Sequence, residues 1–248
     1  MKFIKTSIPQ SESITKSGDW WKLQAFETLY DGGIRQVDAA VEKIINSLRD
    51  NDVLDDTLLI ITSDHGEGFG EWSRLNPSVR MVDHSWGIHE VLTHVPLLVR
   101  PPGGTKDEQV DRIASLTRFP EVVRSRINGG NQLFTVEEYA LSMTNRLEDP
   151  TKVLPSKISE REEYGGPWFA VYESDDNGYV RKFAKQKSNE ISVLIPDAQS
   201  SAVIDQGTNI VDDVYGELES AEIRSQKEPT QNPSEEVEQK LEDLGYLR

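Results

Sequence analysis

The sequence predicts an α/β fold, and three observations carry this prediction. Apolar residues recur at helical spacing from about Gln24 to Arg49, a short apolar run covers Leu58 to Thr62, and a second run covers Val95 to Val99. One apolar stripe at helical spacing indicates a helix that packs on one side, whereas short apolar runs are typical of buried strands. Helix, strand, loop and strand in this order predict a sheet covered by helices.

The first element is a helix with an internal weak point. Its stripe consists of Phe26, Leu29, Ile34, Val37, Val41, Ile44, Ile45 and Leu48, and we expect it to be buried. Gly32 and Gly33 interrupt the stripe. Because each glycine costs roughly 1 kcal/mol relative to alanine, the helix is expected to begin after them or to bend there.

The two apolar runs are expected to be interior strands of one sheet with parallel character. Pro101, Pro102 and two glycines end the second run. In open α/β sheets, ligands bind beyond the carboxyl ends of the strands. Asp64 and His65 follow the first strand almost directly, so we expect them at that edge.

The region from Trp168 to Pro196 predicts a small antiparallel sheet. Asn177 and Gly178 stand between two alternating or aromatic runs, which is a strong hairpin signal, and "NEISVLIPD" predicts a third strand.

The carboxyl-terminal segments are expected to be a linker and a helix. Residues 217–231 are polar and charged, and in the last segment Asn232 can cap a helix whose first turn holds Pro233 and Glu235. The predicted organisation is therefore an α/β domain at 1–160, an antiparallel subdomain at 161–216, an acidic linker at 217–231 and a terminal helix at 232–248.

Composition excludes several classes of site and partner. The chain has 248 residues and no cysteine, which excludes disulfides, thiolate zinc sites and a cysteine nucleophile within it. Its net charge of -16 argues against nucleic acid or an anionic membrane as a partner. No apolar stretch is long enough to span a bilayer, and the first residues lack the apolar run of a signal peptide. We therefore expect a soluble, cytoplasmic protein.

The strongest chemical signal is a cluster of histidines. All four histidines of the chain, His65, His84, His89 and His94, lie between residues 65 and 94. An aspartate oxygen and an imidazole nitrogen suit Zn or Mn better than Ca, so Asp64 and His65 predict a divalent metal site. Gly66 would allow the backbone to turn sharply beside them.

A purely structural role for the same residues is equally consistent with the spacing. An Asp-His pair at a strand end can cap the next helix or hold a loop by hydrogen bonds. For His89 and His94 we expect loop or packing roles.

Two longer stretches resemble a known family. "LDDTLLIITSDHGEGFGE", followed by "DHSWGIHEVLTHVPLLVRPPG", closely resembles the second half of the sulfatase family within the alkaline phosphatase superfamily. The resemblance extends back through "LYDGGIRQVDAAVEKIINSLRDNDVLDDT" and forward to "VEQKLEDLGYL". It implies an alkaline-phosphatase-like mixed sheet flanked by helices, here incomplete and followed by a small antiparallel sheet and a terminal helix.

The resemblance also implies roles for individual residues. The positions of Asp64 and His65 bind the divalent cation in the family, which is Ca in many members, whereas the histidine here favours Mn or Zn. His84 matches the histidine that contacts the sulfate or phosphate group, where a donor stabilises negative oxygens. His89 stands where tyrosine is common in the family, so the resemblance does not determine the substrate pocket.

The family's nucleophile segment, "C-x-P-S-R" or "S-x-P-S-R", has no counterpart in this chain. "SIPQS" at Ser7 to Ser11 lacks the arginine, and "VLPSK" at Val153 to Lys157 has valine in place of the nucleophile. Two metal ligands are also fewer than the three or more that a catalytic site normally takes. We therefore expect the isolated chain to be inactive and poorly stable, with an uncovered apolar face, unless a separate chain supplies the amino-terminal half.

Three functions stay open at this point. The first is hydrolysis of sulfuric esters by the full-length or reconstituted protein. The second is a phosphodiesterase, phosphonate hydrolase or phosphoglycerol transferase that uses the same half-site. The third is a non-catalytic remnant that keeps the fold elements alone.

Overall fold

The computed structural model describes residues 20–77, 80–84, 86–104, 107–144, 166–174, 178–197, 200–206 and 210–220. The chain divides into two compact units, Met1–Val211 and Asp212–Arg248. Both helices and sheets occur in the described residues, as the sequence predicts. No helix among them is both long enough and apolar enough to cross a bilayer.

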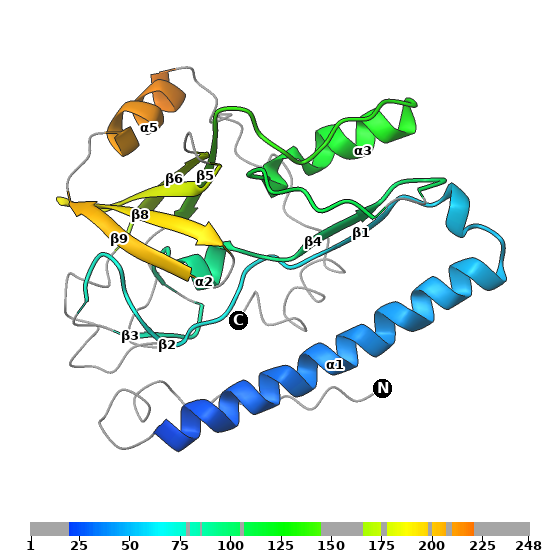
Figure 1. Ribbon diagram of the computed structural model, residues 1–248, viewed down its shortest axis with the longest axis horizontal. Helices are drawn as coiled ribbons and strands as arrows, with labels where there is room; N and C mark the ends of the chain where they lie inside the picture. The colour runs from blue at the N-terminus through cyan, green and yellow to red at the C-terminus, as the bar shows by residue number, and fades with distance from the viewer. Residues whose placement is uncertain are drawn as a thin grey trace, which may run out of the picture. The chain divides into compact units, whose positions relative to one another are not determined.

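The largest element of the first unit is a five-stranded antiparallel sheet in sequential order (Figure 1). Its strands are β5 (Tyr139–Thr144), β6 (Trp168–Ser174), β7 (Val180–Gln186), β8 (Asn189–Asp197) and β9 (Ser200–Gln206). The predicted hairpin and third strand are thus confirmed, and Gly178 takes the positive φ of +82° that the turn requires. The sheet also takes β5 from the region before residue 161.

One face of this sheet forms the core. Alternate residues of β6, β7 and β8 point to this face, because side chains along a strand alternate between its two sides. They pack against the segment from Met81 to Leu92, which follows Asp64 and His65 in the chain. The cluster consists of Met81, Trp86, Ile88, Leu92, Trp168, Ala170, Ala184, Ile191 and Val193.

The two predicted interior strands are antiparallel, so the expected parallel arrangement is wrong for this pair. β1 (Leu59–Thr62) pairs with β4 (Leu97–Arg100) as an isolated two-stranded sheet, and the two lie side by side in Figure 1. Among its described residues, the connection between them holds a hairpin and one short helix. No long crossover helix occurs in this part of the structure to return the chain to the starting end, as a parallel pair requires. Leu98 and Val99 are exposed.

The first helix is continuous, so the expectation that it begins after the two glycines is wrong. α1 (Trp20–Asp50) runs through Gly32 and Gly33. Half of its stripe is also uncovered, because Leu29, Ile34, Val37 and Ile44 are 53% to 62% exposed, whereas the other four residues are partly buried. A helix that keeps its apolar stripe in water lacks the packing partner that the stripe is built for.

Short elements connect the larger ones. β2 (Phe69–Trp72) and β3 (Arg80–Val82) form an antiparallel pair, and α2 (Glu90–Thr93) follows them. The remaining elements are η2 (Leu54–Asp56), η3 (Leu116–Arg118), α3 (Phe119–Ile127) and α5 (Ile210–Ser220). Since α5 extends through Ser220, the first four residues of the expected linker are helical. The rest of the linker and the terminal helix at 232–248 lie outside the described residues.

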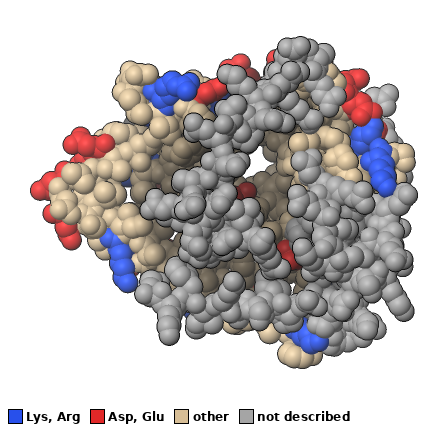
Figure 2. Space-filling model, turned by 180° about the vertical axis from the view of Figure 1, so that it is seen from behind, with Lys and Arg blue, Asp and Glu red and all other residues tan. Residues whose placement is uncertain are grey.

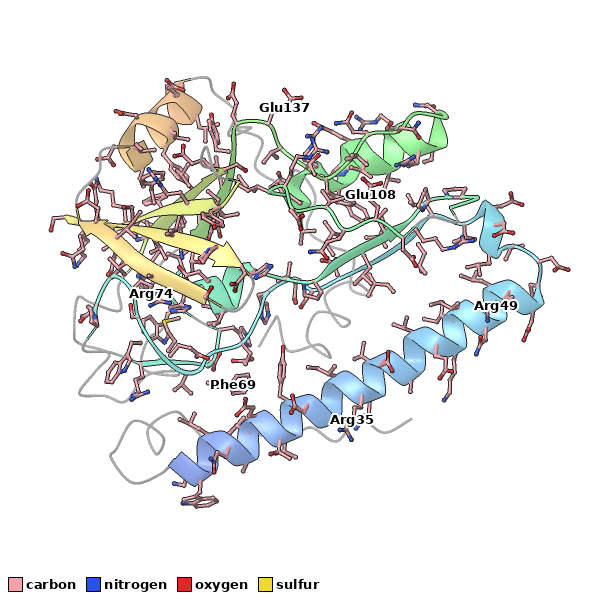
Figure 3. The ribbon with its side chains drawn as sticks, in the orientation of Figure 1. Arg35, Arg49, Phe69, Arg74, Glu108 and Glu137 are labelled. Carbon is pink, nitrogen blue, oxygen red and sulfur yellow. The ribbon has the colours of Figure 1, made fainter. Side chains whose placement is uncertain are left out.

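A buried ion network joins α2 to the sheet. Lys182 is 0% exposed on the apolar face of β7. Its Nζ donates to the carbonyl oxygen of Ile88 and lies 3.1 Å from Glu90 Oε1. Arg74 Nε donates to Glu90 Oε2 at 3.2 Å, and Figure 3 shows Arg74 beside α2. The Glu90 carboxylate is therefore held by two cations, as a buried charge requires.

His89 belongs to this network as a neutral ring. Its Nδ1 accepts a hydrogen bond from Val91 N at 3.2 Å, so that nitrogen carries no proton. Burial lowers the pKa of His89 to about 4, because a charged ring would lose its hydration there. For Glu90, burial raises the pKa, but attraction by Lys182, His89 and Arg74 outweighs burial and lowers it to about 2.

Removing the lysine should leave a buried carboxylate without its main partner. We expect Lys182→Met to lower the free energy of unfolding by about 3 to 5 kcal/mol, measured by urea denaturation. The double variant Lys182→Met with Glu90→Leu should recover much of the loss. Lys43→Ala, at an exposed position of α1, is the control and should change stability by less than about 0.5 kcal/mol. A loss of that small size in Lys182→Met would contradict the network.

Stability should also fall in acid in a range set by His89. Its folded pKa of about 4 lies below the ordinary 6.5, so the folded state resists protonation and loses stability as pH falls from 6.5 to 4. For Glu90, the loss follows between its ordinary 4.5 and about 2. His89→Gln should remove the upper part of this dependence, whereas His94→Gln, at an exposed position, should keep it. Identical pH profiles of unfolding for His89→Gln and the unmodified protein would show that His89 is not buried neutral.

Candidate functional site

The candidate site lies on the loop of residues 63–68, between β1 and β2. Asp64 and His65 follow the carboxyl end of β1, where the sequence analysis expects them. The loop is held internally, because Ser63 Oγ donates to the carbonyl oxygen of His65 at 2.7 Å and His65 N donates to Asp64 Oδ1 at 3.0 Å. These bonds fix the backbone from which both side chains extend.

Asp64 and His65 have the geometry of two ligands of one ion. His65 Nδ1 donates to the carbonyl oxygen of Gly66 at 2.8 Å, because a carbonyl can only accept, and this leaves a lone pair on Nε2. His65 Nε2 lies 3.6 Å from Asp64 Oδ2. Two atoms bound at about 2.1 Å to one tetrahedral ion lie about 3.4 Å apart. Metal-ligating histidines commonly donate their second nitrogen to a backbone carbonyl, as here.

Gly66 is required for close packing rather than for a sharp turn. Its φ is not positive, but a Cβ at this position would lie 1.9 Å from the carbonyl oxygen of Val91. Gly66 N also donates to the carbonyl oxygen of Leu92 at 2.9 Å. The missing side chain therefore lets the loop lie directly against α2.

His84 lies beside His65, so the structure brings all three predicted site residues together. The two rings stack with centroids 4.0 Å apart and an interplanar angle of 23°. His84 comes from the turn after β3 and is 40% exposed at its side chain. A second ring from a separate strand thus lies next to the Asp-His pair.

Glu67 and Asp83 surround His84 with negative charge. His84 Nδ1 donates to Glu67 Oε2 at 3.0 Å and lies 3.3 Å from Asp83 Oδ1. Asp83 Oδ1 also accepts from the backbone N of His84, and Asp83 has a φ of +77°, which aspartate tolerates better than most residues. The hydrogen bond from Glu67 raises the pKa of His84 against the opposing effect of partial burial.

α1 contributes a tyrosine to the surroundings of the site. Tyr30 packs edge-on against Phe69 with ring centroids 5.3 Å apart, and Figure 3 shows Phe69 on the side of β2 that faces α1. Burial, then Glu67 and Asp64, raise the pKa of the Tyr30 hydroxyl. The two carboxylates of the site therefore act on this residue of the helix.

The residues present fit part of a cation site. Asp64 and His65 supply one oxygen and one nitrogen, which matches Mn or Zn better than Ca. A second group of potential ligands in the described part of the chain is Glu67, Asp83 and His84, whose ligand atoms lie within 4.8 Å of one another. In that group His84 Nδ1 already donates a proton to Glu67, so it has no lone pair to offer.

Sequence reasoning missed Glu67, Asp83 and Tyr30. Glu67 stands in the quoted run "SDHGE" and Asp83 directly precedes His84, so their positions next to the predicted residues were the available signal. The sequence held no signal for Tyr30, because only the fold brings α1 to the loop.

The other two histidines stay away from the site, as the sequence analysis expects. His89 is buried and caps α2, and His94 is exposed at the end of that helix. Both stretches that partly mimic the nucleophile segment, at Ser7 to Ser11 and Val153 to Lys157, lie outside the described residues.

The visible surface carries no continuous basic patch among the described residues. On the face drawn in Figure 2, their Lys and Arg side chains stand apart from one another.

Comparisons with known proteins match the part of the chain that carries the site. The family model described as Sulfatase matches residues 8–123. Arylsulfatase K of Gallus gallus is 33% identical over 95 residues, and that of Canis lupus familiaris is 30% identical over 95 residues. Each match covers 38% of this chain and 16% of the relative. No solved structure gives a significant match. Over residues 8–123, the chain is therefore similar to the sulfatase family.

Proposed function

We propose that this chain supplies one half of a divalent-metal site for the hydrolysis of sulfuric esters, and that activity belongs to the full-length or reconstituted form. The observation that carries the proposal is the ligand geometry of Asp64 and His65. The Gly66 carbonyl fixes the tautomer of His65, and Nε2 lies 3.6 Å from Asp64 Oδ2.

Different residues of this chain have different roles around the ester group. Asp64 Oδ2 and His65 Nε2 would hold the cation, with Mn or Zn favoured. When bound, the cation would polarise the ester and keep a nucleophile ionised. His84 lies beside this pair and donates to the ester oxygens, where a charged donor stabilises the negative charge that develops as the bond breaks.

The uncovered surfaces support the view that the chain is incomplete as an enzyme. Half of the apolar stripe of α1 is exposed, and so are Leu98 and Val99 of β4. The β1–β4 pair has no further strand among the described residues on either side. Faces of this kind are normally covered in a stable domain. The relatives are also much longer, since the match covers 16% of each.

Metal binding is the first property to test in the isolated chain. We expect calorimetry with Mn²⁺ and Zn²⁺ to show binding that Asp64→Ala weakens by about 100-fold or more, beyond the roughly 10- to 100-fold cost of losing an outer partner. Asp56→Ala removes an exposed carboxylate of the same region and should leave binding unchanged. Equal metal affinities for Asp64→Ala and the unmodified chain would mean that Asp64 and His65 have a purely structural role.

Turnover tests the rest of the proposal. The isolated chain should not hydrolyse an aryl sulfate, because it carries no nucleophile segment, whereas a form completed by a chain with that segment should do so. Asp64→Ala should abolish activity in the completed form and Asp56→Ala should retain it. Parallel assays with an aryl phosphate diester separate the sulfatase from the phosphodiesterase alternative. Hydrolysis of the sulfate by the isolated chain would overturn the requirement for a second half.

A further inference from the structure

Two contacts define the orientation of the His84 ring. Stacking on His65 at 4.0 Å and 23° fixes the plane of the ring. Within that plane the ring can still turn over, which would exchange Nδ1 with Cδ2 and Nε2 with Cε1. The contact that distinguishes the two orientations is the hydrogen bond from Nδ1 to Glu67 Oε2 at 3.0 Å.

Glu67 is better suited to this task than its neighbour Asp83. Asp83 Oδ1 lies farther from Nδ1, at 3.3 Å, and already accepts from the backbone N of His84. The Glu67 side chain is 18% exposed, so water competes little for its carboxylate. Glu67 also follows the Asp-His pair on the same loop, so its position is tied to that of the predicted metal ligands.

The opposite edge of the ring is available to a ligand. Within the described part of the chain, Nε2 of His84 has no hydrogen-bond partner, and the side chain is 40% exposed. A ring whose Nδ1 is occupied by a carboxylate presents Nε2 outward. This carboxylate–histidine arrangement resembles the one by which outer carboxylates orient functional imidazoles in other sites.

We propose that Glu67 is a positioning residue, which holds His84 with Nδ1 inward and Nε2 directed to the oxygens of the ester. The proposal rests on the proposed function for the identity of the ligand, but the orientation itself does not require activity. The protonated ring, which carries hydrogen on both nitrogens, then donates from Nε2, and when the ring is neutral the Nδ1–H tautomer of His84 should predominate. Loss of the acceptor at Glu67 should return the ring to the Nε2–H tautomer that free imidazoles favour.

The test is ¹⁵N NMR of the histidine rings in the metal-free chain at alkaline pH, where His84 is neutral. The unmodified chain should show Nδ1–H at His84, and Glu67→Ala should shift it to Nε2–H. Glu67→Gln keeps an acceptor oxygen and should retain Nδ1–H. Asp83→Asn and Glu27→Ala, the latter at an exposed position of α1, are the matched controls and should also retain it. Amide spectra show whether each variant is folded. If Glu67→Ala does not fold, the tautomer of His84 in Glu67→Gln is compared with that in the two controls instead.

Three outcomes would overturn the proposal. The first is an unchanged tautomer in folded Glu67→Ala. The second is a shift in Asp83→Asn in place of Glu67→Ala, which would assign the role to Asp83. The third is Zn²⁺ binding that depends on Glu67 and moves the His84 Nδ1 signal, which would make Glu67 a ligand. In the completed enzyme, Glu67→Ala should lower kcat and Glu67→Gln should restore most of it. Inactivity of every form with the tautomer pattern intact would refute the proposed function and leave the positioning role established.

Discussion

The ion pair between Lys182 and Glu90 connects the five-stranded sheet to the short helix α2. The position of the site loop depends on this connection. Lys182 is in the middle of an apolar face, in register with Tyr172 and Val193. A lysine there is costly unless its charge is neutralised, and its partners are the Glu90 carboxylate of the short helix α2 and the carbonyl oxygen of Ile88 just before that helix. The pair therefore specifies where α2 lies on the sheet more strongly than apolar contacts alone would.

The position of α2 in turn determines the position of the site loop. The Leu92 carbonyl at one side of the helix accepts from Gly66 N, and the Val91 carbonyl occupies the space where a side chain at Gly66 would be. Gly66 then carries the carbonyl that orients His65. A chain of direct contacts thus runs from a buried lysine on a distant strand to the imidazole of the proposed metal ligand.

Local patterns in the sequence were sufficient to predict helices and strands and the residues at the centre of the site. The Asn177-Gly178 turn predicts its hairpin because two residues decide the geometry. The strand end before Asp64 was likewise visible. The direction of β4 relative to β1 could not be predicted, because it depends on the path of the intervening chain. The exposure of the α1 stripe was hidden as well, since periodicity shows which side of a helix is apolar and not whether anything covers it.

Side chains that act through long-range contacts were beyond such reasoning. Lys182 reads as an ordinary polar residue of an alternating strand, and only the fold shows that it points to the core. Glu67 and Asp83 are close to predicted residues in sequence, but their convergence on one ring needs the β2–β3 pair.

The shared core has a consequence for how this protein could be divided or recombined. The family match ends at residue 123, yet Trp168, Ala184 and Val193 cover the segment that follows the site loop. Residues 8–123 are therefore not a portable module. A gene fusion or domain swap that transplants only the matched stretch would expose Trp86 and Ile88 to solvent and leave Glu90 without Lys182. The boundary of sequence similarity and the boundary of folding fall at different places in this chain, and recombination would have to respect the second.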